Sequence, residues 1–396
     1  MWGLITVVVA VVVCACGSSP QAESTSTEQS TSVNISAQAL AGRGEVVATE
    51  SGLDAWTSHV PWGTRISRIV YRSTSGVDGT PTTVSGAVFV PAGQRPAGGW
   101  PLIAYAHGTT GITRDCAPSD RADMFGDLTA VNAFLTSGYA VVTTDYQGLG
   151  MRTDAPAHPY LEPATAAYNV IDAVRAARAI EPTIGMSWLV SGASQGGNAA
   201  WATAEYAPTY GSGAGTLVGA VAMVPLLDAT YLTDRAQSGE LTPSQRWLYP
   251  ILVKGVAQGD PQIAPAQHLR GIVADQISVL TSCSGDKSAL AAKVNSAETS
   301  VFTSSSAQAA QRLDARLAQL ALPRTRTEVP ILAIYGSVDE IIPVDVMEVS
   351  LGRGCAEGDS VYRVRREGQG HSLNPGALLG SWISDRFAGK TAAGNC

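Results

Sequence analysis

The chain has 396 residues, of which 45% are hydrophobic and 15% charged, so it can bury a large core. Its formal net charge is −7, and it contains no long run of Lys and Arg. Because phosphate backbones are bound by clustered basic side chains, these numbers argue against a nucleic-acid partner. The length suits two domains, or one α/β domain that carries an insertion.

The first segment has the pattern of an export leader. Leu4 to Val13 is almost purely apolar, yet too short to cross a bilayer. The sequence VCAC over residues 13–16 resembles a bacterial lipobox, with a small residue directly before Cys16. No Lys or Arg precedes the apolar run. We predict a leader over residues 1–16, lipidation at Cys16 and attachment to a membrane surface, with secretion of a free protein as the alternative.

Residues 17–40 are rich in Ser, Thr, Gln and Ala and are predicted to form a flexible tether, because such a composition cannot bury a core. Four cysteines follow, at Cys116, Cys283, Cys355 and Cys396. An even number in an exported chain indicates disulfides, and four cysteines allow three pairings. Neither a Cys-x-x-Cys pattern nor a His pair at ligand spacing occurs, so we expect no metal and no organic cofactor.

After the tether, apolar runs that end in turn residues predict strands that alternate with helices. The strands are expected over 65–74, 82–91, 100–106, 139–145, 187–192, 217–225, 329–336 and 360–366. Helices are expected over 119–137, 163–180 and 375–387, and through Trp201 and Ala204. This alternation indicates an α/β fold of the α/β-hydrolase type, with a mainly parallel sheet flanked by helices. The block 226–325 has no convincing strand and is predicted to be a helical cap, inserted between core segments 41–225 and 326–396.

A nucleophile is predicted at Ser194. The sequence GASQG over residues 192–196 is a Gly-x-Ser-x-Gly pattern, and it lies between a buried strand and a helix, where a nucleophile elbow requires it. A serine hydroxyl needs a base to take its proton. His268 and His371 are the His residues that follow Ser194. His371 comes directly after the last strand and is the expected base, whereas His268 lies in the predicted cap.

Asp339 is the expected acid of the triad, because it follows the strand before the last one and would hold the His371 imidazole in the required tautomer. Glu340, Asp345 and Asp228 are alternatives.

The oxyanion hole needs two backbone N–H groups. We expect one from Gln195 and one from Thr109, with Thr110 as the alternative to Thr109. His107 precedes this loop and is interpreted as a structural brace rather than a base.

Several segments together resemble the secretory lipase family, which includes the yeast lipase A type. They are AHGTTG over 106–111, CAPS over 116–119, TDYQGLG over 144–150, HPY over 158–160, GASQGG over 192–197, YGSVD over 335–339, and Cys355 with Gly370 and His371. The resemblance implies an α/β-hydrolase core with a helical cap, activity on acyl esters, and the disulfides Cys116–Cys283 and Cys355–Cys396. The chain departs from the fungal branch at Thr109 and Thr110, near which that branch carries an acidic residue.

The sequence therefore predicts a serine carboxylic-ester hydrolase, a lipase or esterase, that works through an acyl-enzyme. Alternatives are an acyltransferase with the same triad, a peptidase, and a lipid-binding lipoprotein without activity. The cap residues Trp247, Leu248, Ile251 and Leu252 belong to its most apolar stretch and are expected to line an acyl-binding cavity. The alternative is that they only pack the cap onto the core.

Overall fold

The computed structural model describes residues 1, 3 and 33–396, and residues 33–396 form one compact unit. Its described residues contain a nine-stranded sheet in the order β1-β2-β3-β5-β4-β6-β7-β8-β9. Strands β1, β2, β3 and β5 pair in antiparallel fashion, and every pair from β5 through β4 to β9 is parallel. The bounds are β1 Val46–Ser51, β2 Arg65–Thr74, β3 Pro81–Val90, β4 Trp100–Ala106, β5 Ala140–Thr144, β6 Ile184–Ala193, β7 Thr216–Met223, β8 Ile331–Gly336 and β9 Val361–Arg366.

Alternate residues of the central strands face opposite sides of the sheet, as the two-residue period of a strand requires. In β4, Leu102 and Ala104 join one hydrophobic cluster with α4 (Pro163–Ile180) and α5 (Gln195–Tyr210). Ile103 and Tyr105 join the other cluster, with α3 (Leu128–Thr136) and α13 (Ala377–Phe387). The sheet is therefore buried on both faces, and the predicted fold of the α/β-hydrolase type is confirmed.

The helix over 163–180 forms with the predicted bounds. Pro163 occupies its first position, and the Glu162 side chain accepts hydrogen bonds from the backbone N–H groups of Ala164 and Thr165. The apolar stripe that predicted the helix is buried, namely Ala167, Val170, Ile171, Val174 and Ala177.

The single helix predicted over 119–137 was wrong in its first half. Short 3₁₀ turns, Pro118–Asp120 and Met124–Gly126, come first, and α3 begins only at Leu128. Met124, Phe125 and Gly126 have φ of 50°, 54° and 99°, which no right-handed helix can contain. Helix α12 (Val344–Glu357), β1 and the short α2 (Asp54–Thr57) were not predicted.

The start of the folded part also differs from the prediction. Helix α1 (Ala37–Gly42) is capped by the Ser36 side chain and buries Ala39, so residues 37–40 belong to the fold rather than to the tether. Residues 17–32 of the predicted tether, and the leader with Cys16, lie outside the described residues except for Met1 and Gly3. None of the described helices is long and apolar enough to span a membrane.

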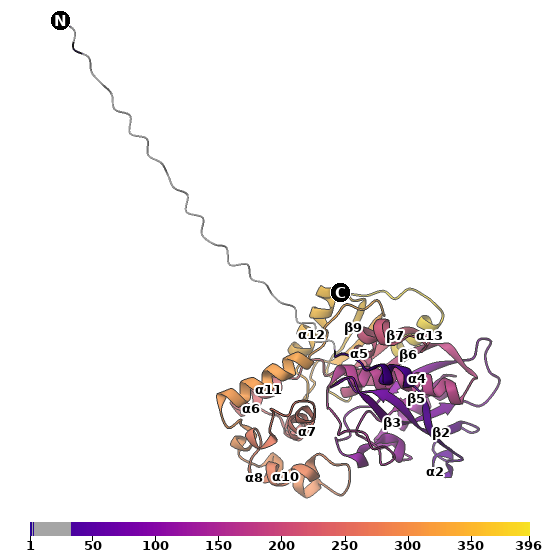
Figure 1. Cartoon of the computed structure of the whole chain (residues 1–396), viewed down its shortest axis with the longest axis horizontal. Helices are drawn as coiled ribbons and strands as arrows, with labels where there is room; N and C mark the ends of the chain where they lie inside the picture. Colours follow the sequence, from indigo (N-terminus) through magenta and orange to yellow (C-terminus); the bar gives the residue numbers. More distant parts are fainter. Residues whose placement is uncertain (2, 4–32) are drawn as a thin grey trace. The chain divides into compact units, whose positions relative to one another are not determined.

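The block 226–325, between β7 and β8, is helical in the described chain and contains no strand. Figure 1 shows its helices grouped beside the sheet. They are α6 Thr230–Ser238, α7 Pro243–Gly259, α8 Gly271–Asp275, α9 Ile277–Leu280, α10 Ser288–Asn295 and α11 Ala307–Leu320. We call this block the insert.

Candidate active site

Ser194 lies at the sharp turn between β6 and α5. Its φ of 57° and ψ of −117° are strained for a residue with a side chain. The turn is fixed by the backbone, because Ser194 N donates to Met223 O at 2.9 Å and Ser194 O accepts from Asn198 N at 3.0 Å. A Cβ on Gly196 would lie 2.0 Å from Ala106 O, so only glycine lets the helix approach β4 this closely. This sharp strand-to-helix turn has the backbone geometry that the predicted nucleophile elbow requires.

Asp339 and His371 meet at the same edge of the sheet. Strands β6, β7, β8 and β9 are parallel neighbours, so the residues that follow β6, β8 and β9 all lie at their carboxyl ends. His371 Nδ1 is 2.8 Å from Asp339 Oδ2. The other Asp339 oxygen accepts from the N–H groups of Ile341 and Ile342, at 2.8 and 2.9 Å.

This arrangement sets the tautomer of His371. The Asp339 side chain is 2% exposed and uses both oxygens as acceptors, so Nδ1 carries the proton in the neutral imidazole and Nε2 has a free lone pair. Within the described residues, no hydrogen bond joins His371 to the Ser194 hydroxyl. Such bonds are often long without substrate and tighten in the reacting complex.

The alternative residues occupy other environments. His268 is buried in the insert with Nδ1 2.9 Å from Ser304 Oγ, and burial lowers its pKa to about 4. Glu340 accepts a hydrogen bond from the His371 backbone N–H rather than from its imidazole. Asp345 is exposed in the first turn of α12, and Asp228 forms an ion pair with Arg353.

Gln195 and Thr109, the expected oxyanion donors, belong to neighbouring segments. Gln195 is buried and begins α5, where backbone N–H groups have no partner within the helix. Thr109 follows β4, and its hydroxyl is 2.6 Å from the Tyr160 hydroxyl. The Thr110 hydroxyl donates to Cys116 O instead. His107 is buried, with Nδ1 2.6 Å from Gly108 O and Nε2 3.2 Å from Asp145 O.

The loop after β4 is tied to the insert. Cys116 and Cys283 form a disulfide, Ile112 N donates to Thr281 O at 2.9 Å, and Cys283 N donates to Asp115 Oδ2 at 3.1 Å. The second disulfide joins Cys355 to Cys396. Both pairings implied by the family resemblance are therefore present.

The insert also holds the loop that carries Asp339. The Tyr231 hydroxyl and the Gln245 side-chain amide both donate to Ile341 O, at 2.9 and 2.7 Å. The Thr242 hydroxyl donates to Glu340 O at 2.8 Å. Because Asp339 accepts from the amides of Ile341 and Ile342, the insert also holds the segment that orients the Asp339 carboxylate.

The structure separates the four residues that were expected to line an acyl cavity. All lie on α7, but Leu248 and Leu252 are buried in the core, at 9% and 0% exposure. Trp247 and Ile251, four residues apart, are only partly buried and form a second stripe. Leu248 and Leu252 therefore pack the insert, whereas Trp247 and Ile251 keep part of their surface exposed.

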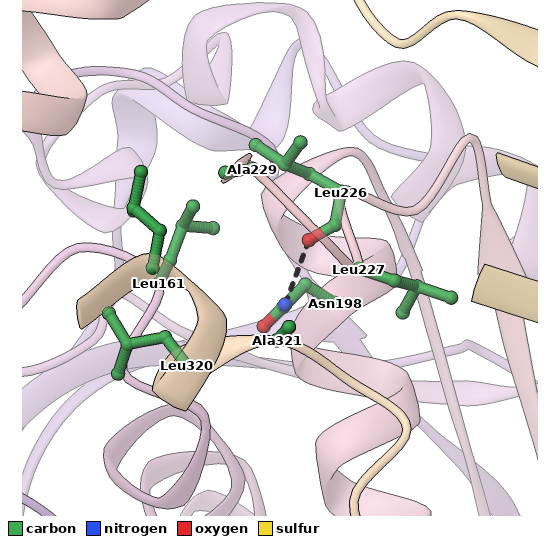
Figure 2. A pocket seen from close by; sticks show the side chains of 8 residues that line it. Leu161, Asn198, Leu226, Leu227, Ala229, Leu320 and Ala321 are labelled. Atoms are coloured by element: carbon green, nitrogen blue, oxygen red, sulfur yellow. Dashed lines mark hydrogen bonds between the residues drawn. The ribbon is translucent and has the colours of Figure 1, made fainter. Parts of the chain in front are cut away.

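Two small, partly open spaces lie beside the first turn of α5. One, of about 10 Å³, is lined by leucine and alanine side chains around Asn198, whose amide donates to Leu226 O at 2.9 Å (Figure 2). The other, also of about 10 Å³, lies between His158, Leu161 and Gln195. Neither could hold an acyl chain, since ligand pockets usually measure about 300 Å³ or more. No cluster of three or more His, Cys, Asp or Glu side chains in the described part could hold a metal ion.

The mainly parallel sheet with helices on both faces has the α/β-hydrolase fold, which solved structures share. The rice cell wall degrading esterase LipA from Xanthomonas oryzae matches with a TM-score of 0.68 at 22% identity, over 87% of this chain and 96% of that one. Candida antarctica lipase A matches with a TM-score of 0.68 at 16% identity, over 88% and 83%.

The sequence itself places the chain in a family. It is 25% identical to Lipase A of Arthroderma benhamiae over 367 residues, which cover 83% of this chain and 72% of the relative. The family model for secretory lipases matches residues 121–395, most of the chain. The chain belongs to the secretory lipase family. It is therefore a carboxylic-ester hydrolase whose substrates are lipids or other acyl esters.

Proposed function

We propose that this hydrolase cleaves acyl esters with Ser194 as nucleophile, His371 as base and Asp339 as the acid that orients His371. His371 Nε2 takes the Ser194 hydroxyl proton while Oγ attacks the ester carbonyl. The tetrahedral intermediate collapses, the alcohol leaves with the proton from His371, and Ser194 keeps the acyl group. His371 then deprotonates a water molecule, which releases the carboxylic acid and restores the Ser194 hydroxyl.

The observation that carries this proposal is the Asp339–His371 hydrogen bond of 2.8 Å at the sheet edge to which the strained Ser194 turn belongs. The negative oxygen of each tetrahedral intermediate would be bound by the backbone N–H groups of Gln195 and Thr109. Such donors act mainly on the transition state.

The experiment compares initial rates of p-nitrophenyl ester hydrolysis by the purified wild type, Ser194→Ala, His371→Ala and the double variant. Each single variant should lose about 10⁴-fold or more in kcat, and the double variant little more, because the groups act as a unit. Near-wild-type rates in Ser194→Ala would contradict the proposal. Product analysis with added alcohol separates hydrolysis from acyl transfer, and the proposal expects free acid as the main product.

We also propose that the enzyme is exported and held at a membrane surface by a lipid on Cys16. The two disulfides support export, because such bonds persist in oxidising compartments. Cys16 lies outside the described residues, so this proposal rests on the sequence pattern. Wild-type protein expressed with its leader should partition into detergent, and Cys16→Ala protein should not. Equal partitioning of the two would contradict lipidation at Cys16.

A further inference from the structure

The segment His158–Tyr160, between β5 and α4, contacts both of the residues that would form the oxyanion hole. His158 Nε2 is 2.9 Å from Gln195 Nε2, and the Tyr160 hydroxyl is 2.6 Å from Thr109 Oγ1. Gln195 and Thr109 come from different parts of the chain, so this segment is a common support for the two. His158 and Tyr160 are both buried, and no step of the mechanism above uses them.

The hydrogen bonds of His158 fix its tautomer. Its Nδ1 is 2.9 Å from Gln147 O, and a carbonyl oxygen can only accept, so Nδ1 carries the proton. Nε2 then accepts from the Gln195 side-chain amide. Burial lowers the pKa of His158 to about 4, so the imidazole remains neutral at ordinary pH and keeps its acceptor.

The hydrogen bond to His158 matters because the Gln195 side chain has few other hydrogen-bond partners. The Gln195 Oε1 atom is buried and makes no hydrogen bond in the described part of the chain. A small, partly open space lies beside this side chain, lined in part by His158, Leu161 and Asn198. Without the His158 acceptor, neither polar end of the Gln195 side chain would have a hydrogen-bond partner in the described part of the chain, and the first residue of α5 would be held less firmly.

Close packing holds the segment itself in place. The Tyr146 ring stacks on the His158 ring, with the two ring centroids 5.9 Å apart. The Tyr146 hydroxyl donates to His107 O at 3.1 Å. A Cβ on Gly148 would lie 2.2 Å from His158 N, and a Cβ on Gly255 of α7 would lie 2.3 Å from Tyr160 Cβ. The segment His158–Tyr160 is therefore packed between the core and α7 of the insert.

We propose that His158 and Tyr160 are positioning residues that hold the two oxyanion donors at the distance the transition state requires. His158 acts through the Gln195 side chain, and Tyr160 acts through the Thr109 hydroxyl. The inference rests on the proposed function, in which Gln195 and Thr109 supply their backbone N–H groups. Because those groups would bind a developing negative charge, loosening them should lower kcat and the affinity for a transition-state analogue, and leave KM nearly unchanged.

The test uses Tyr160→Phe and His158→Leu, with His158→Gln as a rescue variant that retains an acceptor. Removing one oxyanion donor outright costs about 10²–10³ in kcat, so loosening one should cost roughly tenfold. Matched controls are Tyr71→Phe and His268→Leu. Each removes the hydrogen bonds of a buried side chain that does not contact Gln195 or Thr109. Each protein is assayed for kcat, KM, inhibition by an alkyl boronic acid, and Tm.

A double-variant comparison shows whether Tyr160 acts through Thr109. Thr109→Val removes the hydroxyl and retains the backbone N–H, so it should lower kcat as Tyr160→Phe does. The pair should be no worse than either alone. Supporting results are this non-additivity, a fall in kcat and boronate affinity at constant KM, partial recovery in His158→Gln, and controls that change only Tm.

Three results would overturn the inference, and one of them would also overturn the proposed function. If turnover depends on Ser194 but the His158 and Tyr160 variants change only Tm, as the controls do, the inference alone fails. The same holds if the effects of Tyr160→Phe and Thr109→Val multiply. If turnover survives Ser194→Ala, the proposed function fails and the inference fails with it.

Discussion

At the scale of single residues, backbone bonds fix the groups proposed to react. Asp339 Oδ1 accepts from two backbone N–H groups, which leaves Oδ2 to hold His371 Nδ1. Ser194 has a positive φ that bonds to Met223 and Asn198 maintain. These bonds keep Ser194 in its strained conformation, as the surrounding structure does for strained residues at other functional sites.

Asp339→Asn tests the orientation of the imidazole. The asparagine oxygen can still accept from Ile341 and Ile342, but its amide would face His371 Nδ1 and favour the tautomer with the proton on Nε2. We expect kcat to fall by about 10⁴-fold with little change in Tm. Asp345→Asn, which alters an exposed carboxylate on α12, is the control and should retain activity. Equal activity of the two variants would show that Asp339 is not the triad acid.

Glu205 should make stability depend on pH. Burial raises its pKa to about 7, against the bonds from Arg324 N and Trp201 Nε1, and the charge of Asp359 raises it further. The native state then binds more protons than the unfolded state between pH 4.5 and about 7, so the free energy of unfolding falls as pH rises through this range. The loss is about 3 kcal/mol, at roughly 1.4 kcal/mol per pKa unit.

Glu205→Gln should remove this contribution. In urea unfolding at pH 5 and pH 8, the wild type should lose more stability between the two values than the variant does. The other carboxyl groups are common to both proteins and cancel in the comparison. The same loss of stability in both proteins would contradict the assignment.

At the scale of elements, α7 presents two stripes with different surroundings. Leu252 lies in the core, whereas Trp247 is partly exposed. Trp247→Ala should shift the ratio of long-chain to short-chain ester rates with a small change in Tm. Leu252→Ala should cost about 2–5 kcal/mol of stability and leave that ratio unchanged. If both variants change only Tm, α7 does not line the acyl site.

The two disulfides should differ in their effect on catalysis. Cys116–Cys283 closes a loop of 167 residues and Cys355–Cys396 one of 41. On the chain-entropy model their loss costs about 5 and about 4 kcal/mol. Only the first bond holds the loop with Thr109. Replacing Cys116 and Cys283 by Ser should therefore lower kcat as well as Tm, whereas the Cys355 and Cys396 pair should lower only Tm. Unchanged kcat in the first variant would contradict this difference.

At the scale of the whole molecule, the parallel half of the sheet could be predicted because its strands are continuous apolar runs. The Asp339–His371 contact followed from the rule that loops after parallel strands share one edge. Other parts could not be predicted, some for local reasons and some because they depend on contacts between distant segments. The turn at Met124–Gly126 interrupts a helical pattern, and the Gly residues of α12 weakened its signal.

The roles inferred for His158 and Tyr160 could not be predicted because they depend on contacts between distant segments. The sequence shows HPY over 158–160, but nothing local indicates that these side chains meet Gln195 and Thr109. Those contacts span 37 and 51 residues of chain. The insert is likewise joined to the sheet edge at two places, the loop after β4 and the loop after β8, and only the disulfide of the first was implied by the family resemblance.

The central claim is that Ser194 is the nucleophile, and covalent labelling tests it most directly. A fluorophosphonate probe should modify the purified enzyme at one site, which peptide mass spectrometry should locate at Ser194. Labelling should abolish ester hydrolysis and should be absent from Ser194→Ala and slow in His371→Ala. An active enzyme that the probe leaves unlabelled, or labels at a residue other than Ser194, would contradict the account.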